Sequence, residues 1–407
     1  METFTPAETL LDSAPPYRFP PEGSHSTVRP PVPLRSEASE HLVSRGHLPA
    51  VEIVDGHEPH DTDLSSLSTR TNNAIGRYFL NEDDQKYSVA PSDKSAQTAS
   101  VWDMGQVLEA TLSSGKGDPS TNDQFKKELS ELDNYWDKKN GFAFDPPGYA
   151  SGYGPSDFIY YDDNAWIGLG LIDAYKQSPD SQYLDRAKQI FNLEEFGSKY
   201  TDRLPHPGGV LWTQNPDKLF RGTVSTAGAA QLALELYQQT HDQKYLDFGK
   251  KQFEWVDKTL KDSDGLYFDG INEDGKIEGQ KYSYNQGLML GDATLLYKAT
   301  GDAKYLKEAQ DIARASLDAF TGDRKAGGPE PLAEQAPFFN AAFFKNLMLL
   351  DSVAPDPSYR QALADYSKYM AEKVDPESGL ITVKGKKTLQ DQASAVQIFA
   401  LAEQNPV

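Results

Sequence analysis

The chain has 407 residues and not one cysteine, which excludes disulfide bonds, thiolate metal sites and cysteine nucleophiles. It also lacks any run of about 18 apolar residues, so no membrane-spanning helix is predicted. Positive charge is scarce, because 40 lysines and arginines face 61 aspartates and glutamates, and the formal net charge is -21. Such an acidic chain is repelled by nucleic acid and by anionic membrane surfaces, so neither is expected as a partner.

Histidine is also scarce, and most of it lies near the N-terminus. Of the seven histidines, only His206 and His241 lie beyond residue 60. No loop of the type that cradles phosphate groups occurs anywhere in the chain. We therefore expect neither a metal ion nor a cofactor, and any chemistry in the body of the chain has to depend on carboxylates.

Residues 1–67 are rich in proline, serine, glutamate and histidine and show no periodic pattern. The pairs Pro15-Pro16 and Pro30-Pro31 interrupt any helix there, and little apolar surface is available to offset the entropy of ordering. We predict a disordered leader over 1–67 and a single domain over 68–407. The N-terminus has neither a basic region nor an apolar region of the secretory type, so a cytoplasmic location and export by an unconventional route both stay open.

From residue 68 onward, aromatic residues recur at a nearly constant spacing, at positions 125, 183, 245, 305 and 359. Around each of these aromatic residues, one predicted amphipathic helix ends in a short polar junction. The next predicted helix begins directly after a residue that can cap it. The intervals of 54 to 62 residues each fit one helical hairpin. The pattern predicts twelve helices, near residues 68–80, 100–113, 121–139, 163–178, 181–199, 223–240, 243–261, 284–300, 303–320, 334–351, 357–374 and 388–403.

Six such hairpins predict an all-α fold of the (α/α)6 toroid type, in which an outer ring of helices surrounds an inner ring. An open helical solenoid has the same repeat logic and is the alternative. The closed ring is preferred because no polar capping repeat follows the last helix. The loops before the even-numbered helices are long, and most are aromatic and rich in glycine, so a toroid would gather them on one rim, where function usually lies.

One of these loops leads into the stretch Tyr160-Tyr161-Asp162-Asp163-Asn164-Ala165-Trp166. Two consecutive aspartates at a helix start are ordinarily an N-cap and a favourable charge near the positive end of the helix dipole. On an open rim the same pair also fits glycoside hydrolysis, which uses one protonated and one ionised carboxyl group. Like charges that are held close push the two pKa values apart.

Further aromatic and amide residues of the predicted rim can contact a sugar. Trp212 lies in one long loop, and Tyr284-Asn285-Gln286 opens another inner helix. Aromatic rings stack on pyranose faces and amides bind hydroxyl groups, although in isolation each can equally be a packing residue or a cap. The segment from Asp269 to Gly275 does not match a calcium-binding loop, and a β-turn built on Asp-Gly is expected there.

Several motifs, in this order, resemble those of glycoside hydrolase family 76. They are Tyr-Tyr-Asp-Asp-Asn-Ala-Trp (160–166), Gly-Gly-Val-Leu-Trp (208–212), Ser-Thr-Ala-Gly-Ala-Ala-Gln-Leu-Ala-Leu-Glu-Leu-Tyr (225–237), Gly-Leu-Tyr-Phe-Asp-Gly-Ile-Asn (265–272) and Tyr-Asn-Gln-Gly (284–287). The family contains endo-α-1,6-mannanases and is related to fungal wall transglycosidases. The resemblance implies an (α/α)6 fold and a retaining mechanism on α-1,6-linked mannan, with Asp162 as the nucleophile and Asp163 as the general acid/base.

The hypothesis from the sequence is therefore a monomeric glycoside hydrolase that acts on an α-mannan-like oligo- or polysaccharide. The candidate sugar contacts are Tyr153, Tyr161, Asn164, Trp212, Tyr267, Asp269, Tyr284, Asn285 and Gln286. One alternative is a transglycosidase, in which an acceptor sugar replaces water. The other is a glycan-binding or effector module that has no turnover.

Overall fold

The computed structural model describes residues 64–81, 83–91, 97–115, 122–137, 146–152, 158–322 and 328–407. These residues belong to one compact unit. The predicted leader, residues 1–67, lies outside the described residues except for its last four, which already belong to helix α1 (Leu64–Tyr78). The helical body thus begins before the boundary that we predict at residue 68.

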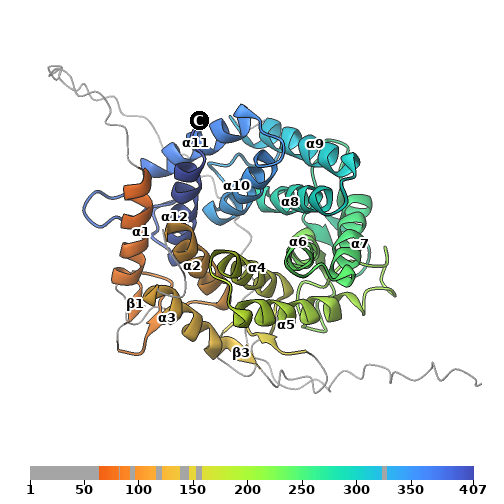
Figure 1. Ribbon diagram of the computed structural model, residues 1–407, viewed down its shortest axis with the longest axis horizontal. Coiled ribbons are helices and arrows are strands. Elements are labelled where there is room, and N and C mark those ends of the chain that lie inside the picture. Colours follow the sequence, from red (N-terminus) through yellow and green to blue (C-terminus); the bar gives the residue numbers. More distant parts are fainter. Residues whose placement is uncertain are drawn as a thin grey trace, which may run out of the picture. The chain divides into compact units, whose positions relative to one another are not determined.

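Twelve α-helices in the described part of the chain form an inner and an outer ring (Figure 1). The inner ring consists of α2 (Val101–Ser114), α4 (Tyr161–Gln177), α6 (Thr223–Thr240), α8 (Ser283–Thr300), α10 (Pro337–Asp351) and α12 (Leu389–Gln404). The outer ring consists of α1, α3 (Asp123–Leu132), α5 (Ser181–Ser198), α7 (Gln243–Leu260), α9 (Ala303–Phe320) and α11 (Pro357–Ala371). Each inner helix contacts the next, and α12 contacts α2, so the ring is closed. The predicted (α/α)6 toroid is confirmed, and the open solenoid is excluded.

Inner and outer helices differ in how much of their surface is buried. In α6, 13 of the 18 residues are buried, and most of these are alanine, leucine, serine or threonine. In α7 only 7 of 18 are buried, along one face. A helix enclosed on all sides has no polar stripe, whereas a helix at the periphery keeps one. Close approach also requires small residues, because a Cβ atom on Gly287 of α8 would lie 2.6 Å from the Cα atom of Phe343 on α10.

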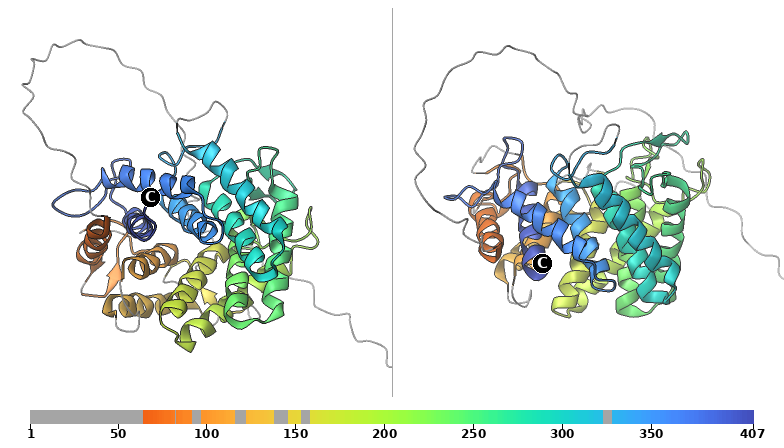
Figure 2. Two further views of the ribbon diagram at one scale, coloured as in Figure 1. Left: turned by 45° about the horizontal axis from the view of Figure 1, so that its top comes forward. Right: turned by 90° about the horizontal axis from the view of Figure 1, so that it is seen from above.

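Short junctions join four of the inner helices to the outer helix that follows. Asp180, Asp242, Asp302 and Asp356 are the N-cap residues of α5, α7, α9 and α11, and each carboxylate accepts the backbone N–H two residues further on. These bonds satisfy donors that the first helical turn leaves free. The repeated junctions that the sequence predicts are therefore helix boundaries. Because each hairpin is antiparallel, all inner helices begin on one rim and end on the other (Figure 2).

The loops before the inner helices carry small antiparallel strand pairs. They are β1 (Leu80–Asn81) with β2 (Lys86–Tyr87), β3 (Trp136–Asp137) with β4 (Gly148–Tyr149), and a sheet of order β5-β6-β7 from β5 (Arg221–Gly222), β6 (Gly270–Ile271) and β7 (Ile277–Glu278). The turn between β6 and β7 closes with a bond from Gly275 N–H to the Asn272 carbonyl, 3.0 Å long, and Gly275 has a φ of 85°. This is the β-turn that the sequence predicts. The sheet holds the loop before α6 against the loop before α8.

The left-handed conformation of Gly301, directly after α8, allows a test of where this helix ends. Gly301 has a φ of 69°, and no described atom lies within 4 Å of the place where its Cβ would be. Only the backbone penalty remains, so Gly301→Ala should lower the free energy of unfolding by about 1 kcal/mol. Gly76, inside α1, has equally open surroundings, so Gly76→Ala should raise the free energy by about 0.5–1 kcal/mol. Urea denaturation of both variants measures the two changes, and changes of the same sign would contradict the assignment.

Candidate active site

Asp162 and Asp163 lie in the first turn of α4, on the rim where the inner helices begin. The helix starts at Tyr161, behind Tyr160, whose side chain makes no capping bond. Neither aspartate is the N-cap residue, so the interpretation of one of them as a helix cap is wrong. Both side chains are half-buried, neither sealed in the core nor fully in solvent.

The Asp162 carboxylate has donors for one oxygen only. Trp212 Nε1 donates to Asp162 Oδ2 over 3.1 Å, and the backbone N–H groups of Asp162 and Asp163 also donate to the carboxylate. The second oxygen, Oδ1, is buried and has no hydrogen-bond partner among the described residues. Because this oxygen belongs to a carboxylate on the loop-bearing rim, it is a candidate for contact with a ligand.

The pKa values of both aspartates are raised. Burial and, to a smaller extent, the charge of Asp269 raise the pKa of Asp162 to about 7, against the bonds from Trp212 and the backbone. Burial raises the pKa of Asp163 well above its usual range, and the charges of Asp162 and Asp103 add to this. The start of a helix favours ionised carboxylates, but desolvation and like charge outweigh that effect here. Both carboxyls of the pair thus bind a proton more tightly than an exposed aspartate does.

A third carboxylate belongs to the same site. Asp269, just before β6, accepts a bond from Asn285 Nδ2 over 3.1 Å and a long one from the Tyr284 hydroxyl over 3.4 Å. Burial raises the pKa of Asp269, and these two bonds oppose the rise. The Asn285 Oδ1 atom is buried and has no partner among the described residues. The charge of Asp269 acts on Asp162, so the structure brings the two aspartates of α4 together with Asp269 and with Tyr284 and Asn285, which lie at the start of α8, the next inner helix but one.

Trp212 is fixed by its own neighbours before it reaches Asp162. Its ring centroid lies 4.9 Å from that of Tyr160, in a tilted arrangement, and 6.3 Å from that of Phe220, edge to face. Its backbone carbonyl accepts the Tyr161 N–H over 2.9 Å, and its own N–H bonds the Phe220 carbonyl over 2.9 Å. The indole N–H therefore reaches Asp162 from a rigid loop.

Aromatic rings of four inner helices pack together near the acid pair, and Tyr284, a predicted sugar contact, is one of them. Phe338, at the start of α10, meets Trp102 at 5.4 Å and Trp166 at 5.3 Å, both edge to face. Tyr284 stacks on Phe339 at 4.2 Å with an interplanar angle of 20°. The rings come from α2, α4, α8 and α10, and Trp166 and Phe338 also line the cavity in the bore. We call Trp102, Trp166 and Phe338 the aromatic floor.

Asn164 and Gln286 hold the fold together and do not face a ligand. Asn164 is fully buried, and its side chain bonds the backbone N–H of Tyr149 (2.7 Å), the carbonyl of Tyr149 (2.9 Å) and that of Tyr160 (2.8 Å). Gln286, also fully buried, bonds the N–H (2.8 Å) and the carbonyl (2.9 Å) of Tyr267 in the same way. Each amide fastens a loop to the first turn of an inner helix.

A third copy of this arrangement shows that it belongs to the architecture. Gln392, in the first turn of α12, bonds the N–H of Ile381 over 2.7 Å and the carbonyls of Ile381 and Thr388 over 3.1 Å. The three copies lie on α4, α8 and α12, which are alternate helices of the inner ring. The expectation that Asn164 and Gln286 contact sugar is corrected, because all their polar groups are used by the backbone.

Two tyrosines of the predicted site are core residues. Tyr161 is 2% exposed, and its ring lies so close to Gly197 that a Cβ there would be 2.5 Å away. Tyr267 is fully buried, and its hydroxyl donates to Asp257 over 2.8 Å, on the outer helix α7. Both expectations of sugar contact are corrected, because the rings fill space between helices. Tyr153 lies outside the described residues.

Asp103 is a functional candidate that the sequence analysis misses. It forms a capping box with Ser100 at the start of α2, and its charge contributes to the raised pKa of Asp163. The signal is present in the sequence, because Ser100 and Asp103 have the spacing of a capping box at the start of an inner helix. Every such start lies on the same rim as the acid pair.

Neither a metal site nor a membrane span is found in the part of the chain that the structure describes. No cluster of three or more histidine, aspartate or glutamate side chains there is arranged to hold a metal ion. None of the helices in these ranges combines the length and the apolar character that crossing a membrane requires.

A closed ring of six hairpins and two neighbouring carboxylates on its loop-bearing rim are the features to compare with known proteins. Residues 65–401 match the model of glycosyl hydrolase family 76, and the chain belongs to this family. The family that the sequence motifs indicate is thus confirmed.

Curated relatives match over part of their length. Mannan endo-1,6-α-mannosidase DCW1 of Saccharomyces cerevisiae is 26% identical over 214 residues, covering 48% of this chain and 47% of that protein. The meiotically up-regulated gene 191 protein of Schizosaccharomyces pombe is 26% identical over 253 residues, covering 58% and 54%. The chain spans about half the length of these curated relatives.

Solved structures of the family match over most of the chain. A family 76 glycoside hydrolase from a bovine Bacteroides thetaiotaomicron strain is 26% identical, with a TM-score of 0.71 over 84% of this chain and 78% of that one. An α-1,6-mannanase of Salegentibacter sp. HEL1_6, solved in complex with α-1,6-mannotriose as an inactive variant with two consecutive aspartates replaced by asparagine, is 20% identical. Its TM-score is 0.68 over 84% of this chain and 100% of that one, which supports the fold.

The buried acid pair should lower the free energy of unfolding, and it should do so more at high pH than at low pH. The pKa of Asp163 is higher in the folded protein than in the unfolded chain. At a pH between these two pKa values the folded protein therefore binds more protons than the unfolded chain, so its stability falls as the pH rises through this range. Asp163→Asn should therefore raise the free energy of unfolding by about 1–2 kcal/mol near pH 8, and hardly change it near pH 4. Urea denaturation at both pH values measures the difference.

The matched control is Asp311→Asn on the outer helix α9. The bond from Lys307 lowers the pKa of this exposed aspartate, so its loss should slightly reduce stability near pH 8. An Asp163→Asn variant that gains as much stability near pH 4 as near pH 8 would contradict the raised pKa.

Proposed function

We propose that the domain starting at residue 64 is a monomeric glycoside hydrolase that cleaves α-mannosidic linkages, α-1,6 in the first place, in an oligo- or polysaccharide. The observation that carries this proposal is the pair Asp162 and Asp163, half-buried in one helical turn, where burial raises the pKa of both carboxyls and the charge of Asp162 raises that of Asp163 further. Inverting enzymes keep their carboxyls far enough apart to admit a water molecule, whereas retaining enzymes hold them closer. Neighbouring residues of one turn favour the retaining mechanism.

In the first step the ionised Asp162 attacks the anomeric carbon and forms a covalent glycosyl ester. The glycosidic C–O bond breaks, and Asp163 gives its proton to the leaving oxygen. In the second step Asp163, now a carboxylate, takes a proton from water, and the water oxygen displaces Asp162 from the anomeric carbon. Both carboxyls return to their starting states. The negative charges of Asp269 and Asp103 favour the positive charge that builds up on the sugar ring in each transition state.

Asp269, Tyr284 and Asn285 are the proposed sugar contacts at and beside the start of α8, which α6 separates from α4. The unpaired Asn285 Oδ1 can accept a bond from a sugar hydroxyl, and the ionised Asp269 can accept another. Trp212 is proposed to orient the nucleophile through its bond to Asp162 Oδ2. Tyr153 stays a proposed contact on the basis of its loop alone.

The comparisons support the substrate class. One relative bears the name mannan endo-1,6-α-mannosidase, and one solved neighbour is an α-1,6-mannanase seen with mannotriose. In the latter, the inactive variant lacks two consecutive aspartates, the same pattern as Asp162 and Asp163. These observations favour mannan over other glycans for this chain.

Replacing either aspartate of the pair tests the roles directly. Asp162→Asn and Asp163→Asn should each lower kcat on α-1,6-mannotetraose by about 10³-fold or more, since one removes the nucleophile and the other the proton donor. Azide should restore turnover in both variants when the leaving group is a good one. It should give a β-mannosyl azide with Asp162→Asn and an α-mannosyl azide with Asp163→Asn, because only the second variant still forms the covalent intermediate.

The control for this test is Asp185→Asn on the outer helix α5, whose carboxylate is exposed and paired with Lys188. It should keep the parent kcat. Near-parental turnover by a folded Asp162→Asn or Asp163→Asn protein would refute the assignment. Products longer than the substrate, when an acceptor sugar is added, would show that the intermediate is passed to a sugar instead of water.

The bond from Trp212 provides a test of the nucleophile's charge state. This bond lowers the pKa of Asp162, so Trp212→Phe should move the acidic limb of the kcat/KM profile to higher pH. We also expect about a tenfold loss of kcat/KM at the optimum. Trp255→Phe is the matched control, because Trp255 Nε1 donates over 3.1 Å to the His206 carbonyl, away from the acids. A pH profile that is the same in both variants would contradict the orienting role of Trp212.

A further inference from the structure

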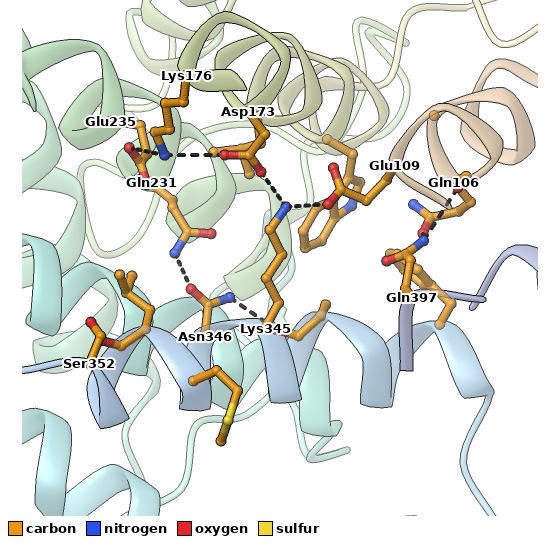
Figure 3. Close-up of a pocket in the computed structure, with 17 residues that line it drawn as sticks. Gln106, Glu109, Asp173, Lys176, Gln231, Glu235, Lys345, Asn346, Ser352 and Gln397 are labelled. Atoms are coloured by element: carbon orange, nitrogen blue, oxygen red, sulfur yellow. Dashed lines mark hydrogen bonds and ion pairs between the residues drawn. The ribbon is translucent and has the colours of Figure 1, made fainter. Parts of the chain in front are cut away.

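A cavity lies in the bore of the ring (Figure 3), and Trp166 and Phe338 of the aromatic floor form part of its wall. Its volume is about 310 Å³, and helices α2, α4, α6, α10 and α12 line it. Asp173 in this cavity follows Asp162 on α4 by eleven residues, or about 16 Å along the helix axis. We call this cavity the rear pocket and define it by Trp166, Glu109, Asp173, Lys176, Glu235 and Lys345.

A continuous chain of ion pairs crosses the rear pocket. Lys345 on α10 bonds Glu109 on α2 over 2.7 Å and Asp173 on α4 over 2.5 Å. Lys176 bonds Asp173 over 3.1 Å and Glu235 on α6 over 2.8 Å. Each lysine is thus shared by two carboxylates, and the neighbouring lysines lower the pKa of Asp173 to about 2 against the effect of burial. Figure 3 shows all five side chains pointing toward one another across the bore.

Hydrogen-bond acceptors are in excess in the rear pocket. The three carboxylates carry more lone pairs than the two ammonium groups occupy, and the inner helices all end around this mouth, where their dipoles are negative. An anion is therefore unfavourable. Solvent reaches the group, because 39% of the Lys345 side chain is exposed, and Ser352 at the end of α10 is exposed beside it. The pocket is open to a ligand that offers donors.

The other side of the rear pocket is apolar. Trp166, Leu169, Ala342, Met348 and Leu349 face the same space as the ion pairs. A pyranose has this character, since its hydroxyl groups form a polar rim around apolar C–H faces. A small cation fits less well, because it would have to displace a lysine that already bridges two acids.

We propose that the rear pocket binds one pyranose unit of a glycan, with the C–H face against the side of Trp166 and the hydroxyl groups on the carboxylates and on Gln231. It is a second sugar site, on the opposite end of the ring from the acid pair. Only the choice of mannose as the first probe rests on the proposed function. A glycan held at both ends of the toroid would stay close to the enzyme between cleavage events.

The test uses the full chain labelled with 5-fluorotryptophan, which gives five ¹⁹F signals for the five tryptophans. Trp212 reports on the acid pair, and the part of the Trp166 response that a rear-pocket variant removes reports on the rear pocket. Phe variants of each tryptophan assign the signals. Titration with free mannose, which the enzyme cannot cleave, should move both signals with two separate binding curves in the millimolar range. Glucose and galactose are titrated in parallel.

Two variants change the rear pocket without touching the acid pair. Ser352→Phe places a ring at the mouth, and Gln231→Leu removes an amide from the wall. Each should weaken the mannose response of Trp166 about tenfold or more and leave that of Trp212 unchanged. Thr300→Phe is the matched control, because Thr300 also ends an inner helix and bonds the carbonyl four residues back, but does not line the pocket. It should leave both responses unchanged.

Three other results of these titrations would contradict the second sugar site, the nature of its ligand or the proposed function. A Trp166 signal that no hexose moves, or that moves equally in the parent and in Ser352→Phe, removes the second sugar site and leaves the ion pairs with a structural role. A Trp166 signal that responds to spermidine and not to sugars replaces the pyranose by a cation. A response of Trp166 with none at Trp212 would sink the proposed function and leave the rear pocket standing.

Discussion

The closure of the inner ring, where α12 meets α2, is the constraint on which the rest of the structure depends. Closure surrounds each inner helix on all sides, so these helices lose their polar faces and pack through small residues. It also brings the start of every inner helix to one rim. Charged groups in the first turns are therefore partly desolvated and lie within range of one another, which is why burial is the largest cause of the raised pKa values at Asp162 and Asp163.

This desolvation has opposite consequences for stability and for chemistry. An isolated helix start would ionise both aspartates and would be stabilised by them. Inside the ring the second charge is unfavourable, so one proton stays bound, and the folded state loses stability as the pH rises. The same retained proton is what a general acid needs. The acid pair thus lowers the stability of the folded protein at the rim where the carboxylate chemistry is proposed to occur.

The two ends of the bore differ because the helix direction differs. At the rim with the acid pair, helix starts, long loops and aromatic rings come together. At the other end, helix ends surround lysines that each bridge two acids, and these ion pairs tie α10 to α2 and α4 across the ring. The aromatic floor forms part of the wall of the rear pocket. Its rings come from helices far apart in the sequence, so only closure of the ring brings them together.

The sequence by itself determined the twelve helices, their pairing into hairpins, the family and the position of the acid pair at a helix start. These follow from spacing and capping, which are local. Only the tertiary structure decided which polar residues near those helix starts are available. Asn164 and Gln286 look like sugar contacts in the sequence, yet their amides are consumed by buried backbone groups, whereas Asn285, next to Gln286, keeps a free oxygen. The physical reason is that neighbouring residues of a helix point about 100° apart, so each side chain's role depends on what the closed ring places in front of it.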